Sequence, residues 1–279
     1  MDFRQLRISR RSITVAVALV GLVSLAIGAH AALNKRSLDA AKAITTGQNG
    51  DVPARTSRLA LVIGNGHYPD ASAPLAQPIN DARDLSAALR RAGFDVDVVE
   101  DATKDDMNRA TSRLKAKIKP DSVVMLFFGG YGVQVGRESY MIPVDAAIWK
   151  EADVRRDGLS VETVLDAMKE KGAKAKLVVL DASRRNPYER RFRSFSHGLG
   201  PISPPENALI LSSATPGKVV DDSSTANSVL VSELLNNLKA QATAEAAFNK
   251  TRVAISRSSE GAQVPSVSSS LLEDIRIGG

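Results

Sequence analysis

The chain has 279 residues, 43% of them hydrophobic and only 4% aromatic, so one sizeable core must be built from Val, Leu, Ile and Ala. It contains no cysteine, which excludes disulfides, a thiolate nucleophile, zinc–thiolate sites and iron–sulfur clusters. The net charge of +6 comes without a basic stripe interleaved with aromatic residues, so we expect no nucleic-acid binding.

The first 33 residues are expected to be a signal peptide or a signal anchor. Arginines at positions 4, 7, 10 and 11 precede an uncharged run over 12–28, and Ala29-His30-Ala31 follows as an Ala-x-Ala site. That pattern is typical of a cleaved secretory signal. Extended to Leu33, the run reaches the length of about 20 residues that a single-pass anchor needs, so both alternatives stay open. Either one predicts an exported body, in the bacterial periplasm or attached to the inner membrane with the body on the periplasmic side.

A polar linker is expected over 34–57, because this stretch shows no sustained periodicity. From residue 58 onward, apolar runs alternate with helical patterns, and we assign 58–272 to one domain and 273–279 to a tail. The expected strands cover 59–63, 94–99, 122–128, 177–180 and 208–211, with a hairpin around 133–142. The expected helices cover 80–92, 103–118, 160–171, 228–238 and 243–256.

Strands that are apolar throughout and that alternate with helices predict an α/β fold, with a mostly parallel central sheet covered by helices on both faces. In such sheets, ligands bind beyond the carboxyl ends of the strands. Three polar or glycine-rich segments follow expected strands, at 65–68, 129–132 and 181–186. We therefore expect the functional site there, although glycines after strands also serve simply to make tight turns.

The domain resembles the bacterial caspase-like peptidases of the metacaspase and orthocaspase branch, which implies a caspase-hemoglobinase-like fold. No single segment is decisive, but the order and spacing of several together are specific. The segments that carry the resemblance are Leu59-Ala-Leu-Val-Ile-Gly-Asn65, Asn80-Asp81-Ala82, Phe127-Phe128-x-Gly-x-Gly132, Tyr140-Met-Ile-Pro-Val-Asp145 and Leu180-Asp181-Ala182-x-Arg184.

Both catalytic positions that the resemblance implies are substituted. The family has a histidine base where this chain has Tyr131, and a cysteine nucleophile where it has Ser183. A serine hydroxyl needs a base to take its proton, and a tyrosine with an ordinary pKa of about 10 is neutral at pH 7. A cysteine protease is thus excluded, and the resemblance implies a pseudoenzyme. His67 follows the first strand and is a second candidate base for Ser183, unless it is simply exposed to solvent.

The remaining candidate site residues concern binding. The resemblance implies that Asp181 helps to form a pocket for a basic side chain, whereas a carboxylate that satisfies nearby backbone amides is the equally weighted alternative. Asn65, His67, Gly130 and Gly132 complete the expected substrate-binding set. We expect no cofactor and no metal, because the acidic pairs at 105–106 and 221–222 lack the spacing of calcium ligands.

Three functions follow as hypotheses. The first is a non-proteolytic, exported or membrane-tethered module that binds a peptide or protein partner, recognising basic segments. The second is a serine-type hydrolase that uses Ser183 with Tyr131 or His67. The third is a structural partner that forms a homodimer or heterodimer with a caspase-like protein.

Overall fold

The computed structural model describes residues 56–69, 74–184, 198–220, 225–238 and 242–277. The expected signal or anchor over 1–33, and the expected linker up to residue 55, lie outside this part of the chain. Among the helices of the described residues, none has both the length and the apolar character needed to cross a membrane.

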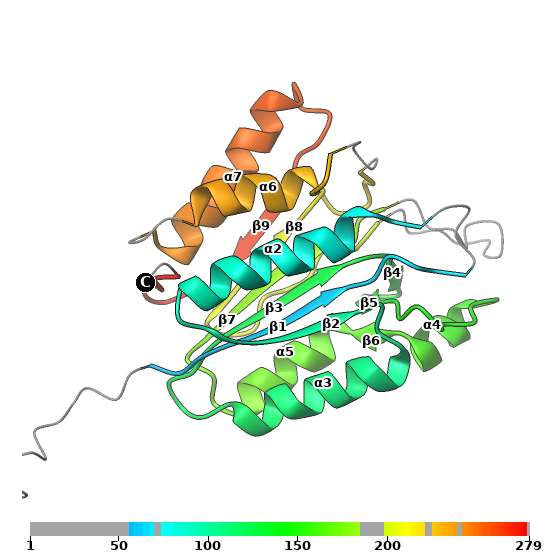
Figure 1. Ribbon diagram of the computed structural model, residues 1–279, viewed down its shortest axis with the longest axis horizontal. Helices are drawn as coiled ribbons and strands as arrows, with labels where there is room; N and C mark the ends of the chain where they lie inside the picture. The colour runs from blue at the N-terminus through cyan, green and yellow to red at the C-terminus, as the bar shows by residue number, and fades with distance from the viewer. Residues whose placement is uncertain (1–55, 70–73, 185–197, 221–224, 239–241, 278–279) are drawn as a thin grey trace, which may run out of the picture. The chain divides into compact units, whose positions relative to one another are not determined.

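A six-stranded sheet forms the centre of the domain, in the order β2-β1-β3-β7-β8-β9 (Figure 1). The first five strands pair in parallel, and β9 pairs antiparallel with β8 at the edge. The mostly parallel α/β sheet expected from the sequence is therefore confirmed. The strands are β1 (Arg58–Gly64), β2 (Asp95–Glu100), β3 (Val123–Gly129), β7 (Ala175–Asp181), β8 (Ala208–Ser212) and β9 (Ser266–Ser269).

Helices cover both faces of this sheet. On one face lie α2 (Gln77–Arg91), α6 (Val229–Asn237) and α7 (Ala244–Ser258), and on the other lie α3 (Lys104–Lys117) and α5 (Val161–Glu170) (Figure 1). Every one of these helices coincides with a helical pattern in the sequence. A capping box is present at the start of α3, since Thr103 and Asp106 exchange side-chain and backbone hydrogen bonds.

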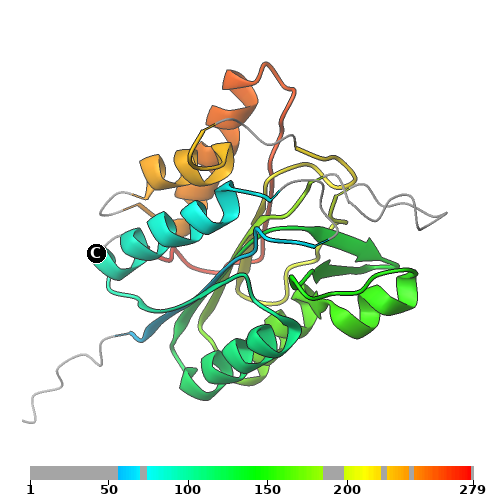
Figure 2. The same ribbon diagram turned by 45° about the vertical axis from the view of Figure 1, so that its right-hand side comes forward.

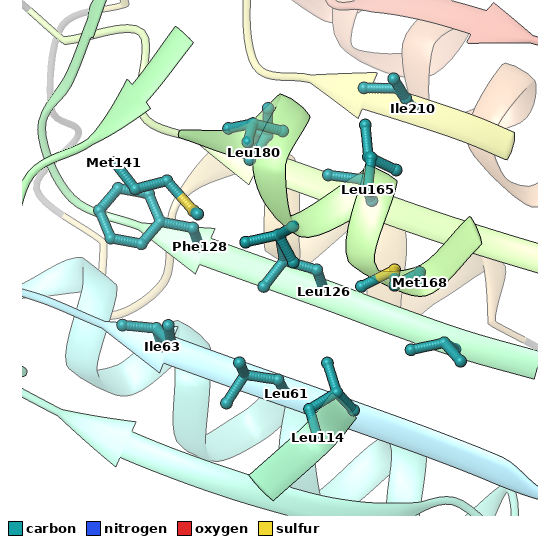
Figure 3. Close-up of a cluster of buried hydrophobic side chains, with 14 of the residues drawn as sticks. Leu61, Ile63, Leu114, Leu126, Phe128, Met141, Leu165, Met168, Leu180 and Ile210 are labelled. Carbon is teal, nitrogen blue, oxygen red and sulfur yellow. The ribbon is translucent and has the colours of Figure 1, made fainter. Parts of the chain in front are cut away.

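The core consists of two apolar layers, one on each face of the sheet. Along β1, Leu61 and Ile63 pack toward α3 and α5, whereas Ala60 and Val62 pack toward α2, α6 and α7. Figure 3 shows the first layer, in which Phe128 lies beside Met141 and Leu126. Each fully buried side chain of this kind contributes about 1.5–3 kcal/mol to the stability of the domain.

A small antiparallel sheet stands apart from the central one. It contains β4 (Gly132–Val135), β5 (Glu138–Met141) and β6 (Leu159–Ser160), and α4 (Glu151–Asp157) lies next to it, in green in Figure 2. The hairpin of β4 and β5 was expected from the sequence, but α4, β6 and β9 were not. The segment that we expected to be a tail contributes Ile275 and Ile277 to the core, with 5% and 1% exposure.

Candidate functional site

Three strands of the central sheet end in register. Gly64 at the end of β1 pairs with Gly129 at the end of β3, and Gly129 pairs with Asp181 at the end of β7. The three segments singled out in the sequence therefore begin at one edge of the sheet, the position where open parallel sheets bind ligands.

The segments that carry Tyr131 and Ser183 run side by side. The backbone N–H of Gly130 donates to the carbonyl oxygen of Asp181 at 3.2 Å, and that of Gly132 donates to Ala182 at 2.9 Å. Tyr131 and Ser183 thus leave adjacent strands at the same edge. Because both glycine amides are used in these bonds, neither is available to stabilise a developing oxyanion next to Ser183.

Ser183 is enclosed by the chain that follows it. The residue is only 1% exposed, and its carbonyl oxygen accepts a hydrogen bond from the N–H of Val220 at 2.7 Å. A Cβ built on Gly198 would lie 3.4 Å from the Cβ of Ser183, so this glycine packs directly against the serine. The position of the family nucleophile is therefore covered in this conformation.

Tyr131 is held in place by a second tyrosine. The rings of Tyr68 and Tyr131 meet edge to face with centroids 4.7 Å apart. The Tyr68 hydroxyl donates to the carbonyl of Ile142 at 2.9 Å and accepts from the backbone N–H of Tyr131 at 3.1 Å. Tyr131 itself is 8% exposed. Its ring thus packs in the cluster beneath the small sheet.

A buried ion pair lies at the end of β7. Arg184 is 4% exposed, and its Nη2 is 3.0 Å from Oδ2 of Asp181, which is equally buried. The Nη1 of the same guanidinium donates to the carbonyl oxygen of Gly130 at 3.2 Å and to that of Asp181. The carboxylate expected to bind a basic side chain therefore binds an arginine of its own chain.

A second buried carboxyl, that of Asp81 in α2, belongs to the same cluster. Its Oδ1 accepts the backbone N–H of Ser228 at 2.9 Å, whereas its Oδ2 has no hydrogen-bond partner in the described part of the chain. Burial raises the pKa of Asp81 to about 7, and the negative charge of Asp181 adds to the rise, against the opposing effects of Ser228 and Arg184. Arg184 thus pairs with Asp181, and the charges of both groups act on the nearby carboxyl of Asp81.

Three of the residues expected to bind substrate, Asn65, Gly130 and Gly132, make contacts within the fold instead. Asn65 is fully buried, and its amide group bonds the backbone of Ala102 and Ile142, so it ties together the loops after β2 and β5. A Cβ on Gly130 would lie 2.5 Å from the Tyr68 hydroxyl, and one on Gly132 would lie 2.6 Å from Leu199. These glycines permit close packing between segments.

His67 faces away from the serine. Its Nδ1 is 2.6 Å from Oδ2 of Asp101, and its side chain is 66% exposed. Asp101 follows β2, and β2 lies on the side of β1 opposite to β3 and β7. The other oxygen of Asp101 accepts hydrogen bonds from the backbone N–H groups of Gly66 and His67. Burial raises the pKa of Asp101, but these two bonds and the imidazole of His67 outweigh burial, so the pKa lies below its usual value. The histidine thus belongs to a different corner of the edge.

Comparison with known proteins settles the family. The family model of the caspase domain matches residues 57–276, nearly the whole of the described body. The chain belongs to the caspase domain family. Its sequence is also similar to the human mucosa-associated lymphoid tissue lymphoma translocation protein 1, with 29% identity over 143 residues, 51% of this chain. The mouse homologue is 30% identical over 141 residues, 49% of this chain. The matched regions cover 17% and 16% of these relatives, so this chain spans only a small part of their length.

Within this caspase domain, sequence reasoning missed three residues that shape the site. Asp81 and Arg184 stand in segments that carried the resemblance, but nothing in either segment shows that they meet. Asp101 has a φ of +47°, a left-handed conformation that aspartate adopts more readily than most residues. Among the described residues, no group of three or more His, Asp or Glu side chains is placed to hold a metal ion.

Proposed function

We propose that this caspase-domain protein is a binding or regulatory module without proteolytic activity, and that it recognises basic segments of a peptide or protein partner. The observation that carries the proposal is the pair of buried carboxyls, Asp81 and Asp181, beside a serine at the nucleophile position. Carboxylates at the carboxyl ends of parallel strands are well placed to bind a guanidinium through charge-assisted hydrogen bonds.

The geometry around Ser183 supports the absence of proteolysis. The serine is covered, the amides of Gly130 and Gly132 donate to the carbonyl oxygens of Asp181 and Ala182, and His67 is paired with Asp101. A chain without cysteine has no thiolate to offer, and a serine without an adjacent base is a weak nucleophile. We further propose, from the basic and apolar pattern of residues 1–33, that the domain acts outside the cytoplasm, as an exported or membrane-tethered protein.

Binding is tested with the full chain and an acetylated peptide amide that contains one arginine, measured by calorimetry. At pH 8, where Asp81 is ionised, we expect saturable binding that is lost when citrulline replaces arginine, because citrulline has no charge. Binding should weaken at least tenfold in Asp81→Asn, which removes one carboxylate from the site. Equal binding of the two peptides would refute the proposal.

Catalysis is tested on the same samples by mass spectrometry of Arg- and Lys-containing peptides after prolonged incubation. We expect no cleavage above that of the Ser183→Ala variant. Cleavage that depends on Ser183 would favour a serine hydrolase instead. The site of action is tested by fusing residues 1–57 to a reporter enzyme that is active only after export; an inactive reporter would contradict an exported body.

A further inference from the structure

Arg184 occupies the acidic site that the proposed function assigns to a partner. Its guanidinium contacts the Asp181 carboxylate at 3.0 Å and the carbonyl of Gly130 at 3.2 Å, and its positive charge acts on Asp81. These are the charge and the donors that an arginine from outside would bring. The site is therefore filled by a group of the kind it is expected to bind.

Burial leaves no direct route to the two carboxyls. Asp81 is 0% exposed, and Asp181 and Arg184 are each 4% exposed. An incoming basic side chain can reach the carboxylates only if another group leaves, and Arg184 is the cation that holds Asp181 in this conformation. Two guanidinium groups bound to the same carboxylate would repel each other, so Asp181 cannot favourably bind Arg184 and an incoming arginine at the same time.

We infer that Arg184 is an intramolecular competitor that keeps the acidic site of this domain closed, so that a basic segment binds only when the Arg184 side chain withdraws. The inference rests on the proposed recognition of basic segments and describes how that recognition is regulated. The observation behind it is the contact of Arg184 with Asp181 and with the backbone at the end of β3.

Competition by Arg184 should raise the apparent dissociation constant of a bound peptide. When the binding-competent state is a fraction of the molecules, the apparent dissociation constant rises by the reciprocal of that fraction. A competitor three residues from its partner aspartate acts at an effective concentration of about millimolar or higher. A site that opens in about 1% of molecules would therefore bind a peptide roughly 100-fold more weakly than a site that is always open.

The test compares the full chain with Arg184→Met, which keeps an unbranched stem of similar girth and removes the guanidinium. Arg83→Met is the matched control, because Arg83 forms an exposed pair with Glu100 and its removal changes the net charge by the same amount. We expect the arginine peptide to bind Arg184→Met at least tenfold more tightly than the unsubstituted protein. Arg83→Met should bind like the unsubstituted protein. Equal or weaker binding to Arg184→Met would overturn the inference.

A second measurement separates this inference from the proposed function. In Arg184→Met, methylguanidinium should raise the midpoint of thermal unfolding by several degrees, whereas tetramethylammonium at the same concentration should not. Rescue by methylguanidinium without any peptide binding would support the closed site and refute recognition of basic segments. Absence of rescue would show that Arg184 is not an exchangeable occupant. If Arg184→Met does not fold, Arg184→Lys, which loses the two-pronged contact but keeps the charge, should bind the peptide more tightly than the unsubstituted protein, and equal binding would refute competition.

Discussion

Two ion pairs at the same edge of the central sheet, here called the two corners, differ in their exposure to solvent. After β7, Asp181 and Arg184 are each 5% exposed in their side chains and satisfy each other. After β1, His67 is 66% exposed and pairs with Asp101 beyond β2. Strand ends are about 4.8 Å apart, and three such spacings separate β2 from β7, so the two corners lie roughly 14 Å apart.

The difference shows where burial controls the chemistry. Solvent screens the pair of His67 and Asp101, so this pair is worth at most about 1 kcal/mol. In the buried corner, each charge depends on its partner, because water cannot replace a lost contact. The corner that holds Asp181 and Arg184 is therefore closed by buried contacts, whereas the imidazole of His67 is exposed and paired with Asp101.

Breaking the buried ion pair should have the largest effect. Arg184→Met leaves two carboxyls without their cation, and we expect the free energy of unfolding to fall by about 3–5 kcal/mol. Denaturant unfolding at pH 7 measures the change. Arg83→Met, which breaks an exposed pair that solvent screens, should lower the free energy of unfolding far less. Similar losses in the two variants would mean that burial does not distinguish the corners.

Removing the charge of Asp81 should stabilise the protein at alkaline pH. The folded-state pKa of about 7 lies above the ordinary value of 3.8, so the folded protein retains a proton that the unfolded chain has released between these values. Stability due to Asp81 therefore falls as pH rises from about 4 to about 7. We expect Asp81→Asn to be more stable at pH 8 by about 4 kcal/mol and equal to the unsubstituted protein near pH 3.

The quantity to measure is the difference in unfolding free energy between Asp81→Asn and the unsubstituted protein, as a function of pH. The contributions of other titrating groups are the same in both proteins and cancel in this difference. A difference in unfolding free energy that stays constant from pH 4 to pH 8 would contradict a buried, protonated Asp81. Asp84→Asn is the matched control, because Asp84 lies three residues further along the same helix and its side chain is exposed.

The close approach of the Tyr68 hydroxyl to Gly130 can be tested by adding one methyl group. Gly130 has a φ of +154°, and a Cβ there would meet the Tyr68 hydroxyl at 2.5 Å. We expect Gly130→Ala to lower the free energy of unfolding by about 2–3 kcal/mol. Gly93→Ala also has a positive φ, of +83°, but meets nothing within 4 Å, so it should cost only about 1 kcal/mol of backbone strain. Equal costs would show that no contact is made at Gly130.

The smallest effect is expected in the exposed corner. His67→Ala removes a screened pair and should change the free energy of unfolding by less than about 1 kcal/mol. Asp101→Ala should cost more, because it also frees the N–H groups of Gly66 and His67. Binding of the arginine peptide should be unchanged in His67→Ala. A tenfold loss of binding there would place the imidazole in the site after all.

Much of the fold followed from local patterns. The apolar strands and the capped helices, such as α3 with Thr103 as its N-cap, are encoded by residues that are close in the sequence. The elements that escaped prediction are short and depend on distant partners. Strand β6 has two residues and pairs with β5, and the Ser-rich β9 is recognisable only from its pairing with β8.

The candidate site was predictable only in part, for a related reason. Strand ends and glycines marked the edge, but the approach of Asp81 to Asp181 depends on how α2 packs over β1 and β3. Likewise, the sequence Asp181-Ala182-Ser183-Arg184 does not reveal that the arginine folds back onto the aspartate. Side-chain direction within a loop is set by the tertiary structure around it, which a single sequence does not report.

The central claim is that Ser183 is covered and unactivated in a caspase domain that binds rather than cleaves. The most direct measurement is intact-mass and peptide mass spectrometry of the folded full chain after treatment with a serine-reactive fluorophosphonate. We predict no adduct on Ser183, even with excess reagent, while a serine protease in the same tube is fully labelled. Stoichiometric labelling of Ser183 that is lost on unfolding would contradict the account.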